Sequence, residues 1–488
     1  MKLPLLLLST FAFLSAVAAA KSPNIVLIVS DDHGTDALGC YGNPIIKTPA
    51  LDSLAADGTL FTDANCTTAS CSPSRSVILS GLHNHSNGMY GLQHTFHHYQ
   101  SFDEVESLPV TLSKNGYRTA RIGKFHVAPE AVYKFDTVLS TGAANDPKTI
   151  GRSPYEMSEE SRPVIESDDQ RPFFLFYATD DPHRSNAFTA DGLPTFDTYP
   201  EPNDFGNRDD GYPGINPVVY DPAKVIVPPF LPDTPACRAE IAQYYQSVSR
   251  LDEGIGHLID ILKKSGKYDN TLILYISDNG IAFPGAKTTL YDPGMNLPLI
   301  VRSPDQSERN LTTNAMVSWV DLTPTILDFA GIDQNQKRAN GTPFRFHGRS
   351  FLDHLSHPNP AGWDVVYASH TFHEITMYYP MRVIRTKRYK YILNLAHQLP
   401  YPFASDLHAA PTWQGIIKSG AKKYGQRDVS AYLQRPRHEL YNVEADPHEI
   451  VNLADNPEFA KTLQSLQSRL KTFQEETRDP WIVKYKYE

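Results

Sequence analysis

Four short apolar runs, each followed at once by polar residues, constrain the fold of this chain most strongly. They span residues 25–29, 173–177, 272–276 and, with a weaker pattern, 118–122. Continuous apolar runs of this length are typical of strands that are buried on both faces of a parallel sheet. The sequence therefore predicts several central strands of one large sheet.

Helical patterns lie between these runs. One opens at Thr48-Pro49 and a longer one at Thr234-Pro235, which closes before Gly266. A Ser or Thr followed by Pro at the start, with Gly after the end, is the usual punctuation of a helix. We expect an α/β fold, with a mostly parallel central sheet flanked by helices on both faces. The longer helix carries one apolar stripe: Ile241, Tyr244, Val248, Leu251, Ile255, Leu258 and Leu262.

The residues that follow the four runs are suited to a binding or catalytic site. In open α/β sheets, ligands bind at the carboxyl ends of the strands, so these residues should converge. A single Asp after a strand is more often a turn residue or a helix cap. Four such groups together favour a site. They are Asp31 and Asp32, then Lys124 and His126, then Asp181, His183 and Arg184, and finally Asp278 and Asn279.

These side chains fall into two chemical sets. Asp31, Asp32, Asp278 and Asn279 offer only oxygen ligands, which favour Ca²⁺ first and Mg²⁺ second over zinc. The second set carries positive charge or moves protons, and with a metal ion it describes a pocket for a sulfate or phosphate ester. Its members are Arg75, Lys124, His126, His183 and Lys287.

The N-terminus and the composition indicate the compartment and exclude some partners. Residues 1–20 resemble a secretory signal peptide, and no later run is long and apolar enough to span a membrane. We expect a soluble protein of the secretory pathway, either lysosome- or vacuole-like or secreted. The net charge of −10 argues against nucleic acid or an anionic membrane as partner. Glycosylation is expected at the sequons of Asn65, Asn310 and Asn340.

Cys71 lies in the stretch TTASCSPSRSVILSGL, and its role is open at this stage. With four cysteines in the chain, a bridge to Cys66 is one interpretation. Another is a thiolate nucleophile, with a pKa lowered by a helix that begins at Pro73 and with His126 or His183 as its base.

The stretch from Cys71 to Arg75, followed by Leu79-Ser80-Gly81, resembles the signature of the sulfatase family. Asp31-Asp32, Gly123-Lys124 and the other strand-end residues follow in the order of that family. The resemblance implies an alkaline-phosphatase-like fold over residues 22–365 and a smaller C-terminal α+β subdomain with an antiparallel sheet over residues 366–488. The stretch HELYNVEADPHEIVNLAD would close the smaller sheet, before an amphipathic helix that opens at Asn456-Pro457.

The resemblance also implies a mechanism. Cys71 would be oxidised to formylglycine by the formylglycine-generating enzyme, and the hydrated aldehyde would be the nucleophile. One Ca²⁺ per chain would be held by Asp31, Asp32, Asp278, Asn279 and residue 71. Arg75 and Lys124 would steady the hydrate, and Lys124, His183 and Lys287 would bind the sulfuryl group. His183 would protonate the leaving group, and His126 would then take the proton of the second hydroxyl. The resemblance implies a homodimer as well.

Further stretches, among them IGKFHVAPEAVYKFD and HEITMYYPMR, resemble the sulfamidase branch of the family. The expected substrate is a sulfated sugar with the N-linked sulfate of glucosamine, bound with the help of Asp181, Arg184 and Glu374. The turn-rich segment 185–235 either borders the sugar pocket or is a surface insertion. Alternatives are an O-sulfatase for another sulfated sugar, a phosphate or phosphonate monoester hydrolase of the same fold, and a glycan-binding protein without activity.

Overall fold

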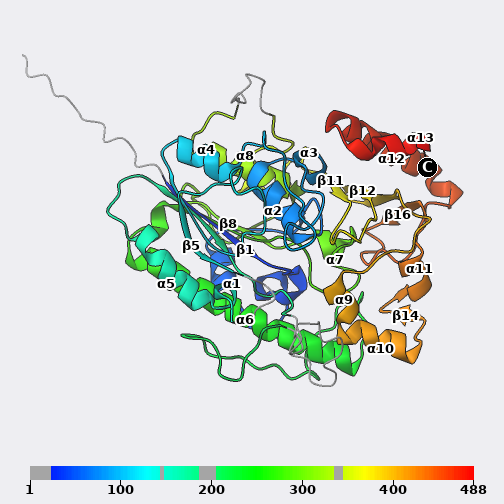
Figure 1. Cartoon of the computed structure of the whole chain (residues 1–488), viewed down its shortest axis with the longest axis horizontal. Coiled ribbons are helices and arrows are strands. Elements are labelled where there is room, and N and C mark those ends of the chain that lie inside the picture. Colours follow the sequence, from blue (N-terminus) through cyan, green and yellow to red (C-terminus); the bar gives the residue numbers. More distant parts are fainter. Residues whose placement is uncertain (1–22, 143–147, 186–204, 335–344, 488) are drawn as a thin grey trace, which may run out of the picture.

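The computed structural model describes residues 23–142, 148–185, 205–334 and 345–487. An eight-stranded sheet runs through the larger part of the molecule (Figure 1), with the strand order β5-β4-β6-β1-β7-β8-β2-β9. Its strands are β1 (Asn24–Ser30), β2 (Thr59–Phe61), β4 (Arg118–Gly123), β5 (Thr137–Thr141), β6 (Phe173–Ala178), β7 (Thr271–Ser277), β8 (Leu299–Arg302) and β9 (Leu311–Thr313).

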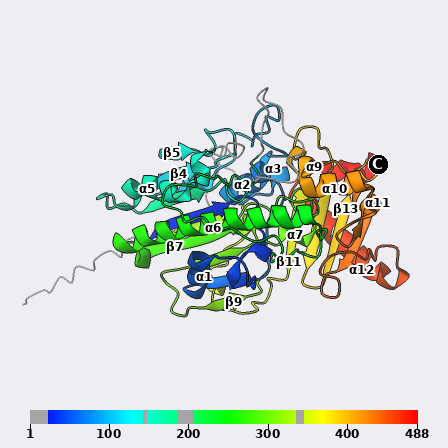
Figure 2. The same ribbon diagram turned by 90° about the horizontal axis from the view of Figure 1, so that it is seen from below.

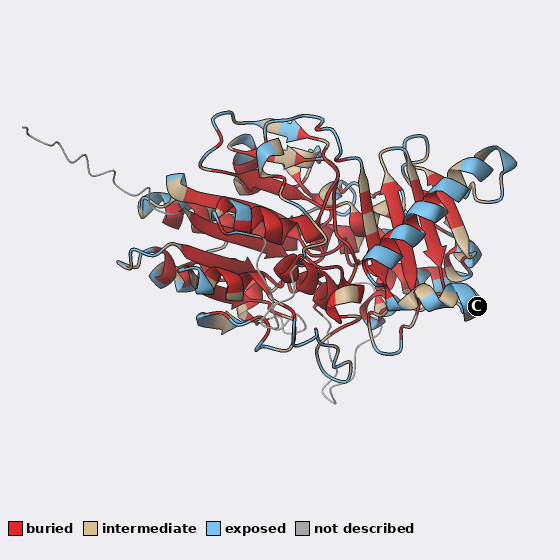
Figure 3. Ribbon diagram, turned by 90° about the horizontal axis from the view of Figure 1, so that it is seen from above, coloured by how far each residue is buried: buried red, intermediate tan, exposed pale blue. Residues whose placement is uncertain are grey.

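The four strands predicted from the apolar runs are neighbours in this sheet. β1 pairs in parallel with β6 on one side and with β7 on the other, and β4 pairs in parallel with β6. Every residue of β1, β6 and β7 is buried, as the prediction of strands covered on both faces requires (Figure 3). Because these strands run in the same direction, their carboxyl ends lie side by side at one edge of the sheet.

Helices cover both faces of the sheet (Figures 1 and 2). α1 (Pro49–Ala56), α5 (Pro154–Ile165) and α6 (Pro235–Lys264) pack on one face, and α2 (Cys71–Ser80), α4 (Leu108–Lys114) and α8 (Leu322–Phe329) on the other. The predicted stripe of α6 is buried throughout. Short helices are α3 (Asn84–Asn87), α7 (Asp292–Met295), α9 (Ser405–Ala409), α10 (Pro411–Ser419), α11 (Val429–Leu433) and α13 (Lys484–Tyr487).

The C-terminal part forms the predicted antiparallel sheet. Its order is β11 (Val365–His370), β12 (Met381–Thr386), β13 (Tyr389–Asn394) and β16 (His438–Asn442). α12 (Ala460–Glu476) follows a turn that starts at Pro457 and buries Leu466, Leu470 and Phe473 against this sheet. The minor strands are β3 (Ala64–Asn65), β10 (Val317–Ser318), β14 (Lys423–Tyr424) and β15 (Arg427–Asp428).

The accessibility of the sequons corrects one prediction. The side chain of Asn65 is fully buried in β3, so there is no room for a glycan on it. Asn310 is exposed and stays a candidate. Asn340 and the predicted signal at residues 1–20 lie outside the described residues. Within the described ranges, no helix has the length and apolar character needed to cross a bilayer.

Candidate active site

Cys71 is the first residue of α2, and the helix starts two residues earlier than the sequence predicted. Pro73 was expected at its first position. The first N–H groups of a helix have no partner within the helix, so Pro in the first turn costs no hydrogen bond. Cys71 is therefore held rigidly at the amino end of a ten-residue helix whose residues are all buried.

The surroundings of Cys71 argue against both the disulfide and the thiolate nucleophile. All four cysteines are free, so the bridge to Cys66 is not formed. Burial raises the pKa of the Cys71 thiol well above its ordinary value, although Lys124 opposes that shift. The helix terminus was expected to lower this pKa, and burial is the stronger effect. An unmodified thiol here would be a poor nucleophile at neutral pH.

The predicted oxygen ligands converge beside Cys71. The amide nitrogen of Asn279 lies 3.6 Å from the Cys71 sulfur. Ligand atoms of Asp31, Asp32, Cys71 and His183 all lie within 4.8 Å of one another. Asp31, Asp32 and Asn279 each keep one buried oxygen, Oδ1, without a hydrogen-bond partner. Several buried oxygens that lack donors are what a hard cation would satisfy.

The charges in this cluster also indicate a site for a cation. Burial raises the pKa of Asp32 to about 8, although Lys287 opposes the shift, and burial together with Asp31 raises the pKa of Asp278 to about 6. Carboxylates packed this closely repel each other when all are ionised, unless further positive charge is present. A divalent ion would supply it.

Cationic side chains enclose the carboxylates from several elements. Arg75, on α2, donates from Nε to Asp278 at 2.8 Å, and Lys124, which follows β4, donates to Asp31. Lys287 donates to Asp32 at 2.9 Å and to Asp406 at 2.8 Å. These buried ammonium and guanidinium groups would attract a compact anion.

The two predicted catalytic histidines lie in the same pocket as Cys71. His183 bonds through Nδ1 to the Arg184 carbonyl at 2.5 Å, and its Nε2 lies 3.0 Å from the Lys287 ammonium. His126 has a φ of 58° and Asp32 one of 64°, in the left-handed region that is strained for residues other than glycine. Such strain is held in place by the surrounding structure and is common at functional sites.

The pocket over Cys71 has a volume of about 500 Å³ and opens to solvent. Its walls combine the predicted Lys124, His126, His183 and Lys287 with residues from both parts of the chain. Glu374 lines it, as predicted for a sugar-binding residue, and accepts hydrogen bonds from the backbone and the hydroxyl of Ser405. The other lining residues include Gln93, His94, His97, Glu130, His373 and Asp406.

Asp181, predicted to help bind substrate, is not part of the pocket wall. Its carboxylate is fully buried and accepts hydrogen bonds from Arg152 at 2.9 Å and from Arg250 at 2.7 and 2.8 Å. Asp181 thus fixes the start of the loop that carries His183.

Arg184, also predicted to bind substrate, is likewise held by other parts of the protein and is not part of the pocket wall. It donates to the Ala282 carbonyl at 2.7 Å and pairs with Glu240 at 2.5 Å, and its guanidinium lies over the rings of Phe205 and Phe283. For segment 185–235, a pocket border and a surface insertion were both open, and residues 186–204 lie outside the described residues. Its described parts, Ser185 and 205–235, contribute no residue to the pocket wall, and contacts from 205–235 run along α6.

The sequence did not single out Asp406 as a site residue. It lies at the start of α9, more than a hundred residues beyond Lys287, and no local motif marks it. Its carboxylate faces Lys287. Burial alone would raise the pKa of Asp406, but Lys287, His183 and His373 together hold it well below its usual range. His373, which lines the pocket, bonds through Nδ1 to the Ser70 hydroxyl at 2.8 Å.

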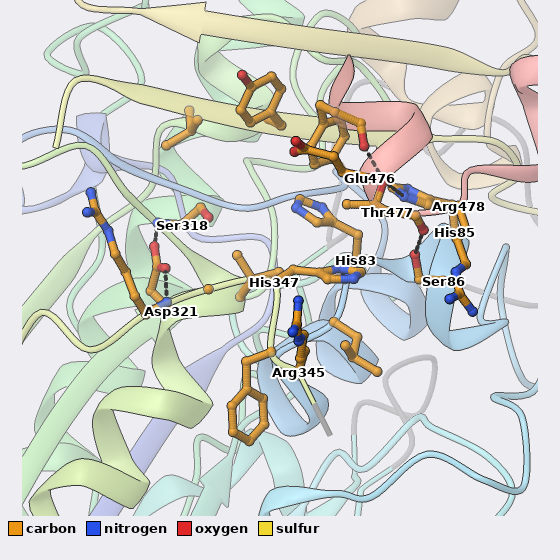
Figure 4. Close-up of a pocket in the computed structure, with 18 of the residues that line it drawn as sticks. His83, His85, Ser86, Ser318, Asp321, Arg345, His347, Glu476, Thr477 and Arg478 are labelled. Atoms are coloured by element: carbon orange, nitrogen blue, oxygen red, sulfur yellow. Dashed lines mark hydrogen bonds between the residues drawn. The ribbon is translucent and has the colours of Figure 1, made fainter. Parts of the chain in front are cut away.

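A second, larger cavity of about 1240 Å³ lies between the two parts of the molecule (Figure 4). None of the predicted site residues lines it. Some of its polar groups bond to each other: Asp321 accepts from the Ser318 backbone at 2.8 Å, and Ser86 donates to the Thr477 carbonyl at 2.6 Å. The convergent chemistry therefore lies in the smaller pocket.

A family model described as sulfatase matches residues 23–332, and one described as N-sulphoglucosamine sulphohydrolase, C-terminal, matches residues 285–414. The chain belongs to the sulfatase family. It is 41% identical to human N-sulphoglucosamine sulphohydrolase over 471 residues, which cover 95% of this chain and 92% of the human protein. An N-acetylglucosamine-6-O-sulfatase of Bacteroides thetaiotaomicron is 27% identical, over 94% of this chain and 87% of the relative.

Solved structures share the fold. A protein in complex with its substrate D-glucosamine-2-N,6-O-disulfate superposes with a TM-score of 0.66, at 22% identity over 94% of this chain and 99% of the other. A phosphonate monoester hydrolase of Agrobacterium radiobacter gives 0.64, at 18% identity over 93% of this chain and 96% of the other. Sulfatases and a phosphonate hydrolase therefore have the same architecture, and the side chains of the pocket must decide the chemistry.

Proposed function

We propose that this sulfatase hydrolyses the N-linked sulfate of a glucosamine N-sulfate unit, with a formylglycine derived from Cys71. The observation that best supports this choice of substrate is the 41% identity to human N-sulphoglucosamine sulphohydrolase along nearly the whole of both chains. The C-terminal match to the same kind of enzyme supports it, because that part contributes Glu374 and Asp406 to the pocket.

The residues present fit a calcium ion. Asp31, Asp32, Asp278 and Asn279 would hold it through hard oxygen atoms, beside residue 71. A bound Ca²⁺ would polarise a sulfuryl oxygen and favour the ionised form of a nearby hydroxyl. The unpartnered oxygens of Asp31, Asp32 and Asn279 support this assignment.

The side chains of the pocket have separate roles in the proposed reaction. Arg75 and Lys124 orient the hydroxyls of residue 71 at the amino end of α2. Lys124 and Lys287 bind the sulfuryl oxygens and balance the charge that develops on them. His183 donates a proton to the leaving nitrogen, and its Nε2 lies 3.0 Å from the Lys287 ammonium, which keeps the imidazole close to the sulfuryl group. His126 takes the proton of the second hydroxyl, which allows sulfate to leave.

The test is the release of sulfate by the purified protein. Glucosamine N-sulfate is compared with a panel of O-sulfated sugars and with a phosphonate monoester. We expect the N-sulfated sugar to have the highest kcat/KM. Preference for an O-sulfated sugar would reassign the substrate, and preference for the phosphonate would reject a sulfatase activity for this pocket.

Maturation by the formylglycine-generating enzyme requires entry into the secretory pathway, which residues 1–20 would direct. We propose a lysosome-like or extracellular place of action and a sulfated saccharide as the partner. Mass spectrometry of the native protein tests entry into the secretory pathway, because a signal peptide removed after residue 20 leaves a mature N-terminus at Lys21.

A further inference from the structure

His94 forms a close contact with the proposed base His126. Its Nδ1 lies 2.5 Å from Nε2 of His126, and the two ring centroids are 4.6 Å apart. His94 comes from the loop after α3, whereas His126 follows β4, so two separate segments are brought together at this point. Both rings line the pocket over Cys71.

This contact indicates which nitrogen of His126 can act as a base. His126 Nδ1 is buried and has no hydrogen-bond partner, whereas Nε2 is engaged by His94. Only if Nε2 carries the proton and donates to His94 is Nδ1 left free to accept another proton. A neutral His94 with an unprotonated Nδ1 therefore holds His126 in its basic tautomer.

The charges around the pair favour this neutral arrangement. Burial and the nearby Lys124 keep the pKa of His126 well below its ordinary value, and burial and the same Lys124 lower that of His94 to about 4. A proton taken up by His126 would therefore be unfavourable unless it moved on. The side chains of His94 and His126 are both partly buried and both line the pocket, so a proton that reaches His94 can pass to pocket water.

We propose that His94 is the proton outlet of the site, through which His126 passes on the proton it receives. Nδ1 of His126 accepts the proton of the second hydroxyl, and Nε2 of His126 releases its own to Nδ1 of His94. Nε2 of His94 then gives a proton to pocket water. Each imidazole gains one proton at Nδ1 and loses one from Nε2. Both rings are then neutral in the other tautomer, and rotation of the rings or proton exchange with solvent restores the starting tautomers. The inference rests on the proposed function of Cys71 and His126.

The backbone geometry indicates that the segments that carry the two imidazole rings are held in specific conformations. His126 has a φ of 58°, and Thr95, next to His94, has one of 51°. Both are in the left-handed region, which few non-glycine residues adopt, although Asn, Asp and His enter it more often than the others. The backbone conformations of the two segments that carry the rings must therefore be held by the surrounding structure.

The variant His94→Asn tests the proposal. The amide oxygen of Asn can accept a hydrogen bond near the position of the imidazole Nδ1, but it cannot relay a proton. We expect kcat to fall about 10- to 100-fold, the range for loss of a partner that orients a reacting group, with KM unchanged. The matched control is His98→Asn in the same loop: His98 has a φ of 53°, which Asn tolerates, and it does not line the pocket.

Two further readouts separate a relay from a structural role. Quenched turnover followed by peptide mass spectrometry should find sulfate retained on residue 71 in His94→Asn, because its departure needs the proton to leave. Added imidazole should restore turnover in His94→Ala. In the resting wild-type enzyme, nitrogen NMR should show His126 protonated at Nε2.

The possible results distinguish a failure of the proton-outlet proposal from a failure of the proposed sulfatase function. A wild-type protein that releases no sulfate from any substrate would remove the proposed function itself. An active wild type with an unchanged kcat in His94→Asn would overturn only the proton outlet. Slow turnover without retained sulfate at residue 71, or without rescue by imidazole, would overturn it as well, since the residue would then only shape the pocket.

Discussion

Asp181 provides the sharpest contrast between a structural role and a role in binding substrate. In the sequence it stands in an Asp-Pro-His-Arg stretch beside the site, and a contact with sugar was the natural expectation. In the structure its carboxylate lies between the guanidinium groups of Arg152 and Arg250, and the three side chains are 0%, 0% and 4% exposed. Replacement of Asp181 by Asn keeps the shape and removes the charge.

The size of the effect follows from this burial. Removing one partner of a buried ion pair costs about 3–5 kcal/mol, because the remaining charge is left without compensation in a poorly polarisable environment. Here two cations share the carboxylate, so we expect Asp181→Asn to lose at least the lower part of that range. Loss of a direct contact with substrate would instead raise KM and leave the free energy of unfolding nearly unchanged.

Urea unfolding followed by circular dichroism measures the first quantity, and sulfate release at a temperature at which the variant remains folded measures the second. The control is Asp210→Asn, whose carboxylate forms a pair with Arg208 on the surface and is 70% exposed. This control should leave the unfolding midpoint in place. A raised KM with an unchanged midpoint in Asp181→Asn would refute the structural assignment.

Other changes probe the rest of the site. Cys71→Ala should abolish turnover and leave the circular dichroism spectrum intact, and Cys71→Ser should be equally inactive when made in a host that matures only cysteine; full activity of either would contradict the formylglycine route. Lys287→Gln should lower kcat by about 10²–10³-fold, as loss of one donor to a developing oxyanion does; a normal kcat would place the sulfuryl group elsewhere. Removal of divalent ions by a chelator should stop turnover and lower the melting temperature, both restored by Ca²⁺; activity that survives exhaustive chelation would remove the metal. Burial lowers the pKa of His85 to about 3, so its neutral form stabilises the fold above pH 6.5, and that contribution is lost as pH falls toward 3; urea midpoints of wild type and His85→Gln should converge in acid, and parallel curves would refute this.

The large sheet and the gathering of the site could be predicted because their signals are local. Each of the runs that became β1, β6 and β7 is apolar at every position, and each ends in residues such as Asp31, His183 and Asp278. Parallel strands bring such ends together whatever the order of the strands. The helix of the Cys71 stretch was also recognisable, although its start was placed at Pro73 and lies at Cys71.

The partners of individual charged groups could not be predicted, because they are set by tertiary packing. Nothing near Asp181 in the sequence reveals that Arg152, at the end of the short 3₁₀ helix Ile150–Arg152, and Arg250, on α6, converge on it. Asp406 reaches Lys287 from the C-terminal part across 119 residues of sequence. Asn65 has a complete sequon but lies in a buried strand, and the triplet alone carries no information on accessibility.

The claim on which the mechanism depends most is that the side chain at position 71 is an aldehyde in the working enzyme. Mass spectrometry of the peptide that contains residue 71, taken from protein with measured activity, tests it directly. We expect the mass of formylglycine, and capture of the same peptide by a hydrazine reagent in proportion to activity. A fully active preparation in which position 71 is entirely an unmodified cysteine thiol would contradict the account.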